Sequence, residues 1–195
     1  MNKIQLQGIL KDIEYSHIVG DIEYFKANLI CNQNGKDIII PIKFKRFCNK
    51  YNEGDFISLT GNIRTYSVKG ENGKVHVNPY IFTYFDIPEE DNQVNLLSLD
   101  GNICKKGDLR KTKTGLDVLD FVLANNIKSN NQVFNTYVPV VAWGKQAKEI
   151  SKLNIGDYLN IEGHFSSRTY KKQNEDGFDL KIAFEVNVDK IIKEK

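Results

Sequence analysis

The chain has 195 residues, of which 41% are hydrophobic and 27% charged, and its formal net charge is +2. This composition is typical of a folded globular protein with one or two cores and excludes a disordered chain. The longest strongly apolar run, Asp37 to Pro41, is too short to span a bilayer, and the N-terminus lacks the apolar core of a signal peptide, so we expect a cytoplasmic protein.

Strand signals dominate the first half of the sequence. Short aliphatic and aromatic runs predict strands at 3–10, 24–31, 38–44, 56–63 and 74–85, with a short helical turn at 46–51. Residues 86–93 are polar and acidic and contain Pro88, so we interpret them as a linker.

The second half repeats this order. Strands are predicted at 97–103, 118–124, 137–143, 158–165 and 178–188, and an amphipathic helix at 145–153 falls between the third and the fourth. Five strands with a short helix in that place are the order of an OB fold, a small, partly open Greek-key barrel.

Matching residues also indicate an internal repeat. Asn2, Ile4, Leu6, Gly8 and Leu10 recur with identical spacing as Asn95, Leu97, Leu99, Gly101 and Ile103. Further along, Pro41 matches Pro139, Gly54-Asp55 matches Gly156-Asp157, and Gly61 matches Gly163. We therefore predict an all-β protein of two tandem OB folds, each a five-stranded barrel with a short helix between strands 3 and 4, in domains 1–88 and 95–195.

The third strand of the second half is informative because successive side chains of a strand point to opposite faces. Val138, Val140 and Ala142 suit the barrel interior, which turns Tyr137, Pro139, Val141 and Trp143 outward. Two large aromatic rings on an outer face are costly unless a neighbouring subunit or nucleic-acid bases cover them. Single-strand binders use such rings as stacking platforms, beside basic residues that contact the backbone.

The second half resembles the bacterial single-stranded DNA-binding proteins over nearly all of residues 95–192. The matching stretches are Asn95 to Gly101, Asp108 to Thr112 with Gly115, Phe121 to Ala124, Val138 to Ala147, Gly156 to Gly163, and Ser167 to Tyr170.

This resemblance implies an OB fold that binds single-stranded DNA without sequence preference in replication, recombination or repair. It also implies that Tyr137, Trp143 and Tyr170 are stacking residues, with Lys145 and Arg168 on the basic path. We expect these three rings to be exposed in the free protein. From the sequence we add, as phosphate-contacting residues, Arg110, Lys111, Lys113, Lys171 and Lys172.

The first half matches more weakly. Aligning Pro41 with Pro139 places Ile39 and Lys45 where the second half has Tyr137 and Trp143, so both aromatic residues are missing. Tyr66 is one candidate stacking residue, whereas Phe25 and Phe47 are expected in the core. The candidate phosphate contacts here are Lys43, Lys45, Arg46 and Arg64.

Charge also differs between the halves. Residues 1–94 contain 11 basic and 12 acidic residues, against 16 and 13 in residues 95–195. An anionic ligand should therefore favour the second half.

Several functions are disfavoured. His17, His76 and His164 are scattered, no phosphate-binding glycine loop is present, and the three cysteines form no CxxC pair. We therefore expect no enzymatic activity, no cofactor and no metal site, with the cysteines as buried thiols. The main alternative is an OB-fold protein-interaction or primosome-like assembly module with little direct DNA binding, in which a protein interface would cover Tyr137 and Trp143.

Assembly is predicted from the family. Its members commonly present four OB folds, which two copies of this chain would supply as a homodimer. Members usually end in a flexible tail with an acidic, hydrophobic tip that recruits replication proteins. The sequence given ends at Lys190 to Lys195 without such a tip, so we do not expect tail-mediated recruitment.

Overall fold

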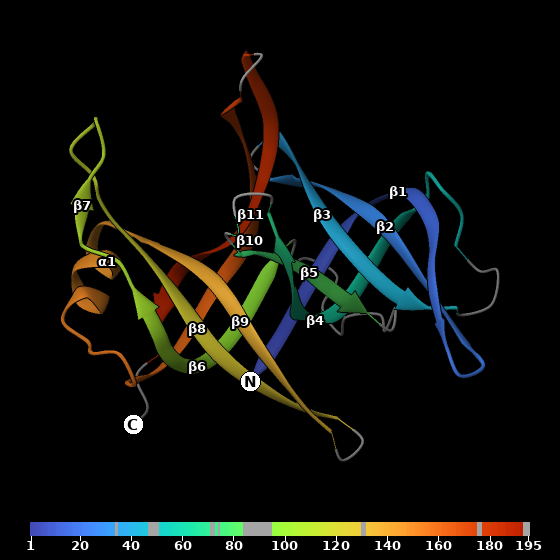
Figure 1. The fold of residues 1–195 in the computed structure, drawn as a ribbon, viewed down its shortest axis with the longest axis horizontal. Helices are drawn as coiled ribbons and strands as arrows, with labels where there is room; N and C mark the ends of the chain where they lie inside the picture. The colour runs from blue at the N-terminus through green and yellow to red at the C-terminus, as the bar shows by residue number, and fades with distance from the viewer. Residues whose placement is uncertain are drawn as a thin grey trace.

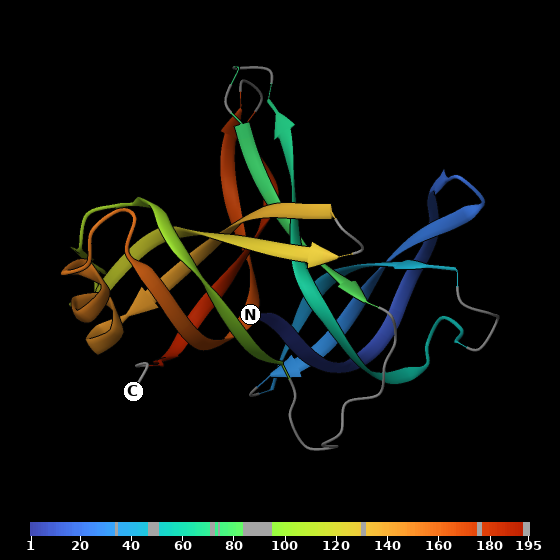
Figure 2. The ribbon, with the colours of Figure 1, turned by 90° about the horizontal axis from the view of Figure 1, so that it is seen from below.

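A computed structural model describes residues 1–33, 35–46, 51–70, 73, 75–83, 95–129, 132–174 and 177–192. These residues form two closed β-barrels that lie next to one another (Figure 1). In both views the N-terminus lies between the barrels (Figures 1 and 2).

The first barrel contains five strands, β1 (Asn2–Val19), β2 (Ile22–Gln33), β3 (Lys36–Lys45), β4 (Phe56–Lys69) and β5 (Val75–Thr83). Each strand pairs with the next in the order β1-β2-β3-β5-β4, and β4 pairs with β1 to close the barrel. The β3–β5 pairing is parallel and the others are antiparallel. This is the predicted OB-fold order.

The second barrel repeats this topology with β6 (Leu96–Lys106), β8 (Asp117–Ser129), β9 (Gln132–Trp143), β10 (Tyr158–Asn174) and β11 (Gly177–Ile191). A two-residue strand, β7 (Arg110–Lys111), pairs with β8 at its edge. Helix α1 (Gly144–Ser151) lies between β9 and β10, as predicted.

A helix in each barrel is not observed. Within the described ranges α1 is the one helix, and the turn predicted at 46–51 falls mostly on residues 47–50, outside those ranges. The predicted linker, 86–93, also lies outside them. No helix in the described part of the chain has the length and apolar character needed to span a membrane.

Strands β1 and β6 join the two barrels by antiparallel pairing, from Asn2 opposite Leu99 to Gln5 opposite Leu96. Across the junction, the Asn2 Nδ2 atom donates to Asn125 Oδ1 over 3.0 Å. The eleven strands therefore form one continuous hydrogen-bonded sheet.

The repeated residues have matching structural roles. Asn2 exchanges two hydrogen bonds with the backbone of Ile63 on β4, and Asn95 does the same with Phe165 on β10. A Cβ atom at Gly8 or at Gly101 would lie 2.4 Å from the carbonyl oxygen of a residue on the adjacent strand. Only glycine fits there, because the first strand of each barrel passes so close to the second.

Side chains that point into the barrels form the core. Fully buried examples in the first barrel are Leu6, Leu29, Ile40 and Leu59, and in the second Leu99, Leu123, Val138 and Ile161. Phe25 is partly buried and packs against this core as predicted, whereas Phe47 lies outside the described residues. Cys31 is buried as expected, but Cys104 is exposed, so the expectation of a buried thiol is wrong at that position. Cys48 lies outside the described residues.

Two hairpins extend beyond the barrels. The β4–β5 and β10–β11 hairpins project on the same side of the molecule (Figure 2). Both are longer than predicted, since β4 continues from the predicted end at residue 63 to Lys69 and β10 from residue 165 to Asn174.

Candidate functional site

Strand β9 has the predicted alternation. Val138, Val140 and Ala142 are at most 1% exposed, whereas Tyr137 is 48% and Trp143 is 37% exposed. Val141 was predicted to point outward beside them, yet it is only 5% exposed. It lies between Asp120 on β8 and Asn187 on β11, so the outer face of β9 presents two separate rings and no continuous apolar patch.

A hydrogen bond fixes the indole of Trp143. Its Nε1 atom donates to Asn187 Oδ1 over 2.7 Å, and Asn187 Nδ2 donates in turn to Ser166 Oγ on β10 over 2.6 Å. The ring is therefore held edge-on against β11 and leaves part of its surface in solvent. Sequence reasoning missed Asn187 and Ser166. Alternation along β11 could have indicated Asn187, because its neighbour Val186 is buried and Asn187 therefore points outward.

The same face continues along β10 to two predicted residues. Arg168 Nε lies 3.4 Å from Glu185 Oε2, and its guanidinium carbon lies 5.9 Å from the centre of the Tyr170 ring. Tyr170 is 38% exposed. Alternation from Ser166 puts Arg168 and Tyr170 on the face that Ser166 shares with Trp143. We call the row of Tyr137, Trp143, Arg168 and Tyr170 the aromatic face.

Arg110 adjoins this face, whereas Lys111 does not. Arg110 pairs with Val118, which pairs with Trp143, so these cross-strand neighbours share one face. Arg110 also forms an ion pair with Asp120. Lys111 is the next residue and points to the opposite face, where it lies 2.9 Å from Asp117.

Asp117 is an ion-pair centre away from the aromatic face. The Lys111 ammonium donates a hydrogen bond to its Oδ1 atom, and the Lys148 ammonium on α1 lies 3.2 Å from its Oδ2 atom. These hydrogen bonds lower the pKa of Asp117. Part of the charge predicted to contact phosphate at Lys111 is thus already compensated within the protein.

Three other predicted lysines are more accessible. Lys113 and Lys145 are exposed, and no acidic side chain of the described residues forms an ion pair with either. Lys171 is exposed and its ammonium lies 4.1 Å from the centre of the Phe178 ring. The side chain of Lys172 lies outside the described residues.

The first barrel carries a different set of rings on its corresponding face. The ammonium of Lys43 lies 5.0 Å from the Tyr66 ring centre and 4.6 Å from that of Tyr80. Arg64 stacks over Phe82 at 3.9 Å. Sequence reasoning missed Tyr80, which is half-buried on this face. It also missed the contact of Phe82 with Arg64, but Phe82 is only 4% exposed and is not available for stacking.

The remaining predicted cations of this barrel lie at the end of β3. Lys45 is half-buried and pairs across the sheet with Tyr24, and Arg46 forms an ion pair with Glu23. Burial and the charge of the neighbouring Lys26 lower the pKa of Lys43. Basic groups are therefore less available here than at Lys113 and Lys145.

The described residues contain no group of three or more His, Cys, Asp and Glu side chains arranged to hold a metal ion. The arrangement instead combines exposed rings, cations and amide groups on the outside of a barrel. Such a surface suits stacking and phosphate contact.

Residues 94–191 match the model of the single-strand binding protein family. This chain belongs to that family. Single-stranded DNA-binding protein 3 of Clostridium acetobutylicum is 31% identical over 81 residues, which make up 40% of this chain and 56% of the relative. The chain thus spans about half of the length of this curated relative.

Solved structures show that the family fold extends to the first barrel. The wild-type single-stranded DNA binding protein from Thermus aquaticus superposes with a TM-score of 0.68 at 18% identity, covering 100% of this chain and 93% of that chain. A deletion mutant of the same protein gives 0.71 at 18% identity, with 100% and 95% covered. Both barrels of this single-strand binding family member therefore have a counterpart in one known fold.

Proposed function

We propose that this protein binds single-stranded DNA independently of base order and protects it during replication, recombination or repair. The observation that carries the proposal is the aromatic face, in which Trp143, Arg168 and Tyr170 lie on one side of the barrel that matches the family. Stacking on an exposed aromatic ring contributes about 1–3 kcal/mol of binding free energy per base, whichever base it is. Relatives are named for the same activity.

The phosphate path in this proposal follows the cations that remain accessible. In the second barrel Lys113 and Lys145 form no ion pair within the described residues, and Arg110 and Arg168 share the aromatic face although each forms an ion pair. We assign smaller contributions to Lys111, which is paired with Asp117, to Lys171, which lies across from Leu180 on the other face of the β10–β11 hairpin, and to Lys172. In the first barrel Tyr66 is the proposed stacking residue, and the proposed phosphate contacts are Lys45, Arg46 and Arg64. Lys43 is proposed as a weaker contact, because carboxylates share its surroundings and burial lowers its pKa. We assign the second barrel, within residues 95–195, the larger share of the affinity, and the first barrel, within 1–88, the smaller.

Binding alone, without catalysis, accounts for this surface. The test is a titration of labelled oligo-dT and of a duplex of equal length at two salt concentrations, followed by fluorescence anisotropy. We expect the single strand to bind more tightly, and its log affinity to fall with log salt by about 0.7 per phosphate contact. Equal affinity for the duplex would overturn the proposal.

We also propose that two chains associate as a homodimer with four OB folds. Support comes from the β10–β11 hairpin, where Phe178, Leu180 and Ile182 are 55%, 66% and 45% exposed. Apolar stripes of this kind leave water when chains associate. Leu180→Asp should shift the sedimentation coefficient toward that of a monomer, and an unchanged dimer would exclude this hairpin from the interface.

The same stripe favours the alternative of a protein-interaction or primosome-like module. The alternative predicts that Leu180→Asp abolishes binding of a protein partner, while Trp143→Ala leaves the affinity for DNA unchanged. The proposed function predicts that Trp143→Ala weakens DNA binding whatever the assembly.

A further inference from the structure

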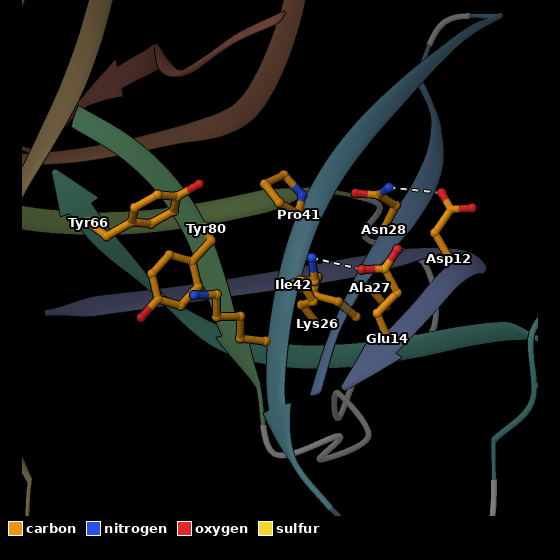
Figure 3. A pocket seen from close by; sticks show the side chains of 10 residues that line it. Asp12, Glu14, Lys26, Ala27, Asn28, Pro41, Ile42, Tyr66 and Tyr80 are labelled. Carbon is orange, nitrogen blue, oxygen red and sulfur yellow. Dashed lines mark hydrogen bonds and ion pairs between the residues drawn. The ribbon is translucent and has the colours of Figure 1, made fainter. Parts of the chain in front are cut away.

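The first barrel contains an open hollow of about 200 Å³ on its outer face. Tyr66 and Tyr80 form one wall, Asp12 and Asn28 the other, and Pro41 lies between them (Figure 3). Its residues come from all five strands of the barrel. We call it the Asp12 hollow.

An unusual backbone conformation places Asp12 at this hollow. Asp12 has a φ of +54° and, with Asn95, is one of two described non-glycine residues with positive φ. The β1–β2 register shifts between Lys11 and Glu14, which marks a bulge at this point. Bulges re-aim side chains and are common beside functional sites.

The carboxylate of Asp12 is held in place and retains an available acceptor. Asn28 Nδ2 donates to Asp12 Oδ2 over 2.9 Å. Among the described residues, no hydrogen bond to Asp12 Oδ1 is formed. The Asp12 hollow thus presents a fixed acceptor opposite two aromatic rings.

Charge in the hollow is balanced, which disfavours a simple phosphate site. Glu14 lies 2.7 Å from Lys26, and the Lys43 ammonium lies over the two tyrosine rings. Two carboxylates and two ammonium groups therefore share the lining. A phosphate would approach both carboxylates, whereas an uncharged base that donates a hydrogen bond would gain from Asp12 and lose nothing to repulsion.

At the matching described positions the second barrel lacks the side chains that line this hollow. The pairing of Pro41 with Pro139 places Val141 at the position of Lys43, and the spacing from Gly61 and Gly163 places Arg168 at that of Tyr66. The parallel pairings of β5 and β11 place Glu185 at the position of Tyr80. The Asp12 hollow is therefore a feature of the first barrel alone and not a copy of the aromatic face.

We infer that the Asp12 hollow binds one nucleobase of the single strand and selects bases with an exocyclic amino group, so that among pyrimidines it favours cytosine over thymine. The amino group of cytosine donates to the Asp12 carboxylate, and its ring packs against Tyr66, which is 48% exposed. Thymine presents a carbonyl oxygen at the same edge, which the carboxylate repels. The inference rests on the proposed function and adds a base preference that the aromatic face does not have.

The test compares oligo-dC with oligo-dT on the full chain, using anisotropy at one salt concentration. The measured quantity is the ratio of the two affinities, because it cancels losses common to both strands. Asp12→Asn keeps the size of the side chain and tolerates a positive φ. We expect it to lower the ratio of dC to dT affinity by about two- to tenfold. The matched control is Asp21→Asn, an exposed carboxylate in the turn of the same hairpin, which should leave the ratio unchanged.

A second variant guards against a folding defect in the first. Tyr66→Leu removes an exposed ring and should weaken both oligonucleotides while also lowering the ratio. Melting curves establish that each variant is folded. A ratio that is the same in the native chain, Asp12→Asn and Tyr66→Leu overturns the inference while leaving the proposed function intact. A native chain that binds neither oligonucleotide overturns both.

Discussion

Replacing Trp143 with alanine should weaken DNA binding and also lower stability. Its side chain is 37% exposed, so most of its surface is already covered in the free protein. Truncating a fully buried tryptophan costs about 3–5 kcal/mol, and scaling by the covered part gives a loss of about 2–3 kcal/mol in unfolding free energy. The hydrogen bond to Asn187 is lost in addition. The sequence led us to expect an exposed ring, but it gave no sign of the hydrogen bond to Asn187.

The effect on DNA is separable from the effect on stability. Loss of one stacked base corresponds to about 1–3 kcal/mol, or roughly a 5- to 150-fold weaker affinity for oligo-dT. Urea unfolding measures the first quantity, and anisotropy at a temperature where the variant is folded measures the second. The control is Tyr158→Ala, which removes a ring that is 49% exposed but lies outside the aromatic face. Native affinity in a folded Trp143→Ala protein, or an equal loss in Tyr158→Ala, would refute the stacking role.

Two further predictions concern single side chains. Lys145→Ala should reduce the slope of log affinity for oligo-dT against log salt concentration by about 0.7. Lys111→Ala should reduce it by less, because Asp117 already pairs with Lys111, and equal changes in the two variants would contradict the proposed phosphate path. Burial raises the pKa of the Cys31 thiol to about 12, so in a Cys48→Ser background a thiol reagent at pH 8 should modify Cys104 rapidly and Cys31 only after denaturation. Rapid modification of two thiols in the native protein would show that Cys31 is accessible.

Much of the fold follows from local sequence signals. Alternation along Tyr137 to Trp143 gave the inward set correctly, because a barrel strand has one buried face and its side chains repeat every second residue. The repeated Gly8 and Gly101 marked the same close approach in both barrels. These features depend on neighbouring residues in one strand or turn.

Other features depend on partners that are distant in the chain. The β1–β6 pairing has no signal in either strand alone, because both already belong to closed barrels. The pairing of Lys111 with Asp117 and of Arg110 with Asp120 required the register of β7 and β8. The sequence around Asp12 gives no sign of its positive φ, since that conformation belongs to a bulge in the pairing with β2.

Trp143 is the only tryptophan of the chain, so its fluorescence reports directly on the aromatic face. The most direct test of single-stranded DNA binding is a titration of the native protein with oligo-dT while Trp143 emission is recorded. We predict saturable quenching that high salt reverses and that a duplex of equal length does not reproduce. Unchanged emission throughout the titration would contradict the account and indicate that bases do not stack on Trp143.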